Sequence, residues 1–148
     1  MIIYESDYIT IQYLEEHSLL ERNWKPSSAE MNHEQFQHEM LQLLKGAEKY
    51  NPLLVLGDTK SFLYVILPDV QIWIDDTVYS QLGEHGVQKM AFVNSEDFFV
   101  QLSVEQSIEE SNKDYEIRYF GNDEEAKIWL FDTNDSIEEE NDDIEETE

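Results

Sequence analysis

Two pairs of residues have types and spacings that could support chemistry. His33 and His38 lie in the segment HEQFQH, which is one residue longer than the HExxH pattern that places two zinc ligands on one helix face. On a regular helix their imidazoles would point roughly 140° apart. Asp75 and Asp76 could form an acid–base pair, but we expect them on the solvated face of a helix. The sequence has no cysteine, so thiolate metal sites are excluded. We therefore expect no metal and no cofactor.

The best polar cluster is the turn GDTKS, in which Asp58, Thr59 and Ser61 follow an apolar run. Asn94 and Ser95 occupy the equivalent place after the next apolar run, MAFV. Ligands of open parallel sheets bind beyond the carboxyl ends of strands, and backbone N–H groups at a helix start can hold an anion. We therefore treat these five residues as a candidate turn for a ligand or a partner. The alternative is that they only satisfy turns and caps.

Catalytic signatures are missing from the sequence. There is no glycine-rich phosphate loop, no GxSxG elbow and no kinase motif, and no set of residues converges on a reaction. We expect a protein that is not an enzyme.

Apolar periodicity predicts the elements that position the candidate turn. Near period two over residues 8–14 and 18–24 indicates two strands, joined through residues 15–17. Helical spacing from Phe36 to Ala47 predicts a helix with a capping box formed by Asn32 and Gln35. The same reasoning extends the order to ββ-α-β-α-β-α-β-α, with strands at residues 53–56, 90–93 and 115–120 and helices that begin near Pro68, Ser95 and Asn122.

This order predicts an α/β fold whose later strands are parallel. The continuous apolar run at residues 53–56 suits a strand covered on both faces. The helix expected after Ser95 takes its apolar residues from Phe98, Phe99, Leu102 and Ile108.

Composition and charge define the domain and its partners. The 148 residues fit one domain, and a hydrophobic content of 41% supplies a core. Residues 132–148 contain ten acids and no base, which predicts an α/β domain at 1–131 and an acidic disordered tail at 132–148. The tail is expected either to solvate the protein or to dock a basic partner. The net charge of −25 argues against nucleic-acid binding.

The chain begins without a signal-peptide pattern, and no apolar run approaches the roughly 18 residues of a membrane span. We expect a cytoplasmic protein without membrane insertion.

Three segments combine apolar strands with capped helices: NPLLVLGDTKSF, GVQKMAFVNSEDFFVQLSVEQ and YEIRYFGNDEEAKIWL. Together they resemble the SpoIIAA-like proteins of the STAS/SEC14 group, over residues 1 to about 131. The resemblance implies a single domain with a mixed sheet and amphipathic helices. In STAS regulators a serine at the start of the helix after this strand is phosphorylated. That position falls here on residues 66–69, ILPD, which carry no hydroxyl, so a kinase-driven mechanism is not expected.

The expected function is that of an intracellular binding or regulatory module that acts through contact with a partner protein, whose surface would be basic. The alternative is a carrier of a small apolar ligand or lipid in a pocket between sheet and helices, as the SEC14 resemblance implies. Trp24, Trp73, Trp129 and the phenylalanines could line that pocket. A closed apolar cavity of about 300 Å³ or more would favour the carrier, and a solid core would favour the module.

Overall fold

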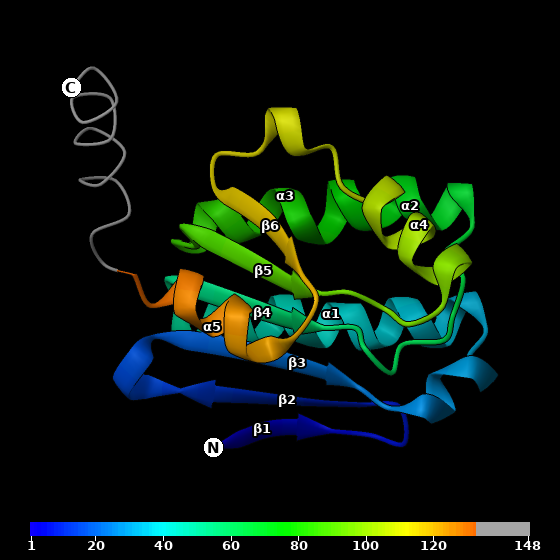
Figure 1. Cartoon of the computed structure of the whole chain (residues 1–148), viewed down its shortest axis with the longest axis horizontal. Helices are drawn as coiled ribbons and strands as arrows, with labels where there is room; N and C mark the ends of the chain where they lie inside the picture. Colours follow the sequence, from blue (N-terminus) through cyan, green and yellow to red (C-terminus); the bar gives the residue numbers. More distant parts are fainter. Residues whose placement is uncertain (133–148) are drawn as a thin grey trace.

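The structure is a computed structural model that describes residues 1–132, and it contains one six-stranded mixed sheet (Figure 1). The first two strand pairs are antiparallel and the last three are parallel, as expected. The strands lie side by side in chain order: β1 (Ile2–Glu5), β2 (Ile9–Leu14), β3 (Leu19–Trp24), β4 (Leu54–Asp58), β5 (Lys89–Val93) and β6 (Glu116–Phe120).

The first strand, β1, was not predicted, so the expected order with two leading strands is wrong by one element. β1 has four residues and no buried side chain. It lies at the edge of the sheet, and its register against β2 is irregular between Ile2 and Tyr4. Because an edge strand of this length does not need an apolar face, it leaves little periodicity in the sequence.

The first helix, α1 (His33–Tyr50), begins as predicted. Asn32 Oδ1 accepts a hydrogen bond from Gln35 N (2.8 Å), and Gln35 Oε1 accepts one from Asn32 N (2.9 Å). The helix ends at Asn51, whose φ of 49° places it in the left-handed region. The predicted capping box is therefore confirmed.

A second long helical segment starts at Pro68 and runs to Gly86 without a break. It comprises α2 (Pro68–Ile74), a π-helical turn (Asp75–Tyr79), α3 (Ser80–Leu82) and a 3₁₀ turn that ends at Gly86, where φ is 104°. The shorter helices are α4 (Phe98–Gln106) and α5 (Asp123–Leu130), and Asn122 caps α5 as expected.

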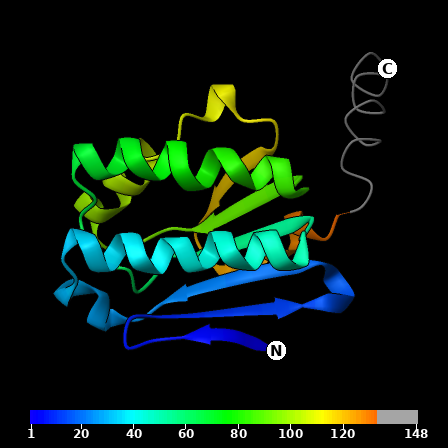
Figure 2. The same cartoon turned by 180° about the vertical axis from the view of Figure 1, so that it is seen from behind.

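The helices cover both faces of the sheet. Figure 2 shows α1 and the α2–α3 segment lying across one face, and Figure 1 shows α5 on the other. Consecutive residues of β4 enter different cores: Val55 packs on the α1 side and Leu56 on the α5 side. The prediction that this strand is covered on both faces is confirmed.

The predicted start of α4 is wrong. Asp97, not Ser95, is the N-cap, because its Oδ1 accepts from Phe99 N (2.9 Å) and Val100 N (3.1 Å). The helix also packs on the core through a different face from the one that the sequence indicated. It buries Val100 and Val104 and leaves exposed the apolar residues Phe98, Phe99 and Leu102; Ile108 is buried beyond its end.

Apart from Asp132, the tail expected at residues 132–148 lies outside the described residues. Over residues 1–132, no helix combines the length and the apolar character needed to cross a membrane.

Candidate functional site

The residues of the candidate turn form local hydrogen bonds with the backbone. Asp58 Oδ1 accepts a bond from Lys60 N (3.0 Å), as expected for a residue that braces a turn. Thr59 is buried, and its hydroxyl donates to the carbonyl of Val93, which also accepts from Thr59 N (3.1 Å). Thr59 therefore ties the end of β4 to β5, and Asp58 braces the turn that follows β4.

The end of β5 holds the loop that follows β4. Ser95 Oγ donates to the carbonyl of Phe62 (3.0 Å), and Asn94 Oδ1 accepts from Gln101 Nε2 (3.1 Å) on α4. We call residues 59–67 the covering loop. The structure thus brings the predicted residues Asn94 and Ser95 next to this loop, which begins with Thr59 and contains Ser61.

Two more serines hold the covering loop. Ser28 Oγ accepts from Leu63 N (3.0 Å), and Ser103 Oγ accepts from Ile66 N (3.1 Å). Hydroxyl groups of the segment after β5, of α4 and of the segment before α1 thus bond to the loop, which belongs to no strand or helix.

Beneath the covering loop lies Arg22, which the sequence analysis did not select. Its side chain is 1% exposed. Nη1 donates to Met40 Sδ (3.4 Å), and Nε has no hydrogen-bond partner. No carboxylate of residues 1–132 forms an ion pair with it. The guanidinium carbon lies 5.9 Å from the ring centroid of Trp24 and 5.7 Å from that of Phe92, which are cation–π distances.

The sheet register places Arg22 beside Gly57 and Phe92. Arg22 pairs with Gly57 on β4, and Gly57 pairs with Phe92 on β5. A Cβ atom at Gly57 would collide with Nη2 of Arg22 and would lie 3.3 Å from Cδ1 of Phe92. The glycine in the sequence LGD is therefore needed for the close approach of the guanidinium to the β4 backbone.

The same row of side chains continues to β6. Tyr119 stacks on Phe92, with ring centroids 5.2 Å apart and an interplanar angle of 15°. Burial raises the pKa of the Tyr119 phenol well above its ordinary value, so this side chain stays neutral at physiological pH. Arg22 supplies the charge in this row.

A small cavity of about 10 Å³ adjoins Arg22. Phe62 and Ile66 of the covering loop line it, and the Phe62 ring centroid lies 4.6 Å from that of Trp24 and 5.8 Å from that of Phe36. This volume is about that of one water molecule. Other hollows, of about 210, 220 and 370 Å³, are open at the surface. The cavity beside Arg22 is therefore far smaller than the roughly 300 Å³ at the lower end for ligand pockets.

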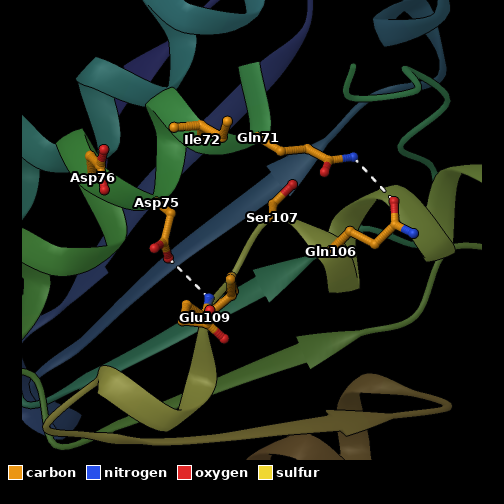
Figure 3. A pocket seen from close by; sticks show the side chains of 8 residues that line it. Gln71, Ile72, Asp75, Asp76, Gln106, Ser107 and Glu109 are labelled. Carbon is orange, nitrogen blue, oxygen red and sulfur yellow. Dashed lines mark hydrogen bonds between the residues drawn. The ribbon is translucent and has the colours of Figure 1, made fainter. Parts of the chain in front are cut away.

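One of these open hollows contains the predicted carboxylate pair (Figure 3). Asp75 Oδ1 accepts from Glu109 N (3.1 Å) and forms an ion pair with Lys113 Nζ (2.8 Å). Asp76 is exposed and points away from Asp75 (Figure 3). The expectation of a solvated face is right for Asp76 and wrong for Asp75, whose carboxylate joins the π-helical turn to the segment after α4.

Other titratable groups have structural partners or lie apart. The buried carboxylate of Glu39 accepts bonds from Tyr4 Oη (2.6 Å) and from Ser6 Oγ. His33 and His38 are both exposed on α1. Within residues 1–132, no group of three or more histidine, aspartate or glutamate side chains is arranged to hold a metal ion.

An exposed apolar surface lies at the end of the sheet where the parallel strands finish. We call it the apolar end surface: Leu63, Val65, Leu67, Ile72, Phe98, Phe99 and Leu102. Its two segments adjoin each other, because Ile66 N bonds to Ser103 Oγ and Gln71 Nε2 bonds to Gln106 Oε1 (3.3 Å). Both phenylalanines are about 70% exposed, at 71% and 69%.

Comparison with protein-family models, curated proteins and solved structures finds no match to this chain. Function is therefore inferred from the chain's own geometry.

A signal for Arg22 was present in the sequence, because period two in LLERNW places it on the same face as Leu20 and Trp24. The exposure of Phe98 and Phe99 depends on which face of α4 packs on the core. The apolar pattern within this one helix does not determine that face.

Proposed function

We propose that this chain is a SpoIIAA-like binding module that contacts a partner protein through the apolar end surface. The observation that carries the proposal is the exposure of seven large apolar side chains on two adjoining segments. Contiguous exposed apolar patches on soluble proteins commonly mark interaction sites. The small size of the cavity beside Arg22, about 10 Å³, favours the module over a carrier of a lipid-sized ligand.

Charge defines the partner. Residues 60–76 and 94–106, which carry the apolar end surface, contain six acids and one lysine, within a chain of net charge −25. Apolar contacts supply affinity, and complementary charge at the rim supplies orientation and a fast approach. The partner therefore presents an amphipathic segment with leucine-like side chains on one face and lysine or arginine at its borders.

The test uses a fluorescein-labelled synthetic helix with leucines on one face and lysines on the other, measured by fluorescence anisotropy. Changing both Phe98 and Phe99 to serine should weaken binding tenfold or more, which is about 1.4 kcal/mol. Ile128→Ser is the matched control, because Ile128 is 67% exposed but lies on α5, on the opposite face of the sheet. It should change the affinity less than twofold.

A second peptide keeps every lysine and replaces the leucines by serine. The proposal requires it to bind at least tenfold more weakly than the amphipathic peptide. Equal binding of the two peptides, or an equal loss with Ile128→Ser, would show that only the general negative charge attracts the peptide, and the proposal would be wrong. Thermal melts of both variants should match the unmodified protein, because the altered side chains are exposed.

A further inference from the structure

We propose that Arg22 is the anchor of a binding site for a small monocarboxylate with an apolar body, and that the covering loop closes this site in the structure. The site lies beneath the covering loop, which also carries Leu63, Val65 and Leu67 of the apolar end surface. It depends on a different observation: within residues 1–132, the guanidinium is buried and has no anionic partner.

The electrostatics of Arg22 favour an anion. Removing a cation from water costs several kcal/mol unless opposite charge and hydrogen bonds compensate for it. Residues 1–131 contain 24 acids, that is, 34 in the chain minus ten in residues 132–148, yet Arg22 pairs with none of them. A guanidinium presents a planar fork of donors that matches a carboxylate. Its Nε is an unpaired donor, so this fork retains capacity for a ligand.

The walls of the site define the rest of the ligand. The cavity is lined mainly by aromatic and aliphatic side chains, among them Trp24, Phe36, Phe62 and Tyr79, and the only charged group that lines it is Arg22. One cation balances one negative charge. A phosphate dianion would bring an uncompensated charge into an apolar wall. The lining therefore fits a singly charged carboxylate attached to an aromatic or short aliphatic body.

The position of the site provides a route of entry. Arg22, Gly57 and Phe92 lie near the carboxyl ends of β3, β4 and β5, where open sheets bind ligands. The covering loop is held there by hydrogen bonds of Ser28, Ser95 and Ser103 and by the burial of Phe62 and Ile66, and it belongs to no strand or helix. Outward movement of Phe62 would extend the 10 Å³ cavity to the surface.

The experiment is an NMR titration of the ¹⁵N-labelled full-length chain with benzoate, benzamide and benzylamine, which share a ring and differ in charge. We expect benzoate to shift amide signals of β3 and β4 in a saturable manner. Benzamide should bind at least tenfold more weakly, and benzylamine should not bind. Phe62→Ala removes the side chain that closes the cavity and should tighten benzoate binding tenfold or more. Phe120→Ala is the matched control, because Phe120 packs on the α5 side of the same sheet and should give no gain.

Arg22→Met should abolish the preference for benzoate over benzamide, and Arg22→Lys should retain part of it. Equal affinities for benzoate and benzamide in both the unmodified chain and Phe62→Ala would overturn the proposal, and this comparison needs no change at Arg22. Shifts confined to Lys60 and the amino terminus would overturn it as well. Tighter binding of inorganic phosphate than of benzoate would overturn the assigned ligand class. None of these outcomes alters the peptide test at Phe98 and Phe99.

Discussion

Replacing Arg22 by methionine is expected to stabilise the fold. Within residues 1–132, the guanidinium is buried, has no ion-pair partner and leaves Nε without a hydrogen bond. Its compensation comes from a contact with Met40 Sδ and from the faces of Trp24 and Phe92. Methionine fills a similar length with apolar atoms and adapts to irregular spaces. The substitution therefore removes a desolvation cost and retains most of the packing.

The magnitude follows from opposing terms. Burial of a cation costs several kcal/mol, and two desolvated cation–π contacts return together about 1–4 kcal/mol. We expect a net gain of about 1–3 kcal/mol for Arg22→Met, within the range found when buried charges are replaced by apolar residues. For a chain of this size each kcal/mol raises Tm by roughly 2–4 °C.

The assay is urea unfolding followed by circular dichroism at neutral pH, with Arg118→Met as control. Arg118 is exposed and lies 5.1 Å from the Trp129 ring centroid, so its removal should cost less than about 1 kcal/mol. A loss of more than about 1 kcal/mol with Arg22→Met would refute the reasoning, because it would mean that the guanidinium is well compensated within the fold. A gain would show that the chain retains Arg22 at the expense of stability, as residues kept for function commonly are.

Four other perturbations test separate contacts. Gly57→Ala should lower the free energy of unfolding by about 1–3 kcal/mol, because the added methyl overpacks against Arg22. The loss measured in urea should be smaller when Arg22 is also changed to methionine; equal losses would contradict the close contact between Gly57 and Arg22. Thr59→Val should cost about 1 kcal/mol in urea unfolding, because its buried hydroxyl loses the bond to a β5 carbonyl; an unchanged midpoint would argue against that bond. Asp75→Asn should lower the free energy of unfolding by about 1–3 kcal/mol, because Asp75 pairs with Lys113, whose side chain is buried. Asp76→Asn should leave stability nearly unchanged, because Asp76 is exposed. Burial, assisted by a neighbouring carboxylate, raises the pKa of Tyr4 to about 12. Since the folded state then holds its proton more tightly than the unfolded state, stability should fall as pH rises from about 10 to about 12. Tyr4→Phe should make that fall shallower in melts recorded across this range, and an unchanged pH profile would contradict the shift.

Much of the fold could be predicted from the sequence, because its signals are local. The capping box at Asn32, Pro68 at the start of α2 and Gly86 at the end of the following helical segment each act within one turn of helix. The apolar run of β4 is long enough to require cover on both faces. β1 could not be predicted because an edge strand satisfies half of its backbone with solvent and requires no apolar alternation.

The sequence predicted where β4 and β5 end, but it did not predict the charged group that lies beside these ends. Asp58 and Ser95 correctly mark the ends of β4 and β5, yet their polar groups hold the covering loop. The charged group at that edge comes from β3, and a strand arginine is ordinarily an exposed residue. Period two places Arg22 on the face of Leu20 and Trp24, but its contact with Gly57 depends on the strand register, which is a long-range property of the sheet.

The strand order has a consequence for how the sheet assembles. Each strand pairs with the one before it in the sequence, so no strand has to enter between two that are already joined. During synthesis from the amino terminus, the chain is able to extend the sheet at a single growing edge, and pulsed hydrogen exchange in stalled nascent chains should show β2–β3 protected before β5. The same order leaves β1 and β6 as the two outer strands. Loss of either one would therefore shorten the sheet without separating the strands that hold Arg22, Gly57 and Phe92.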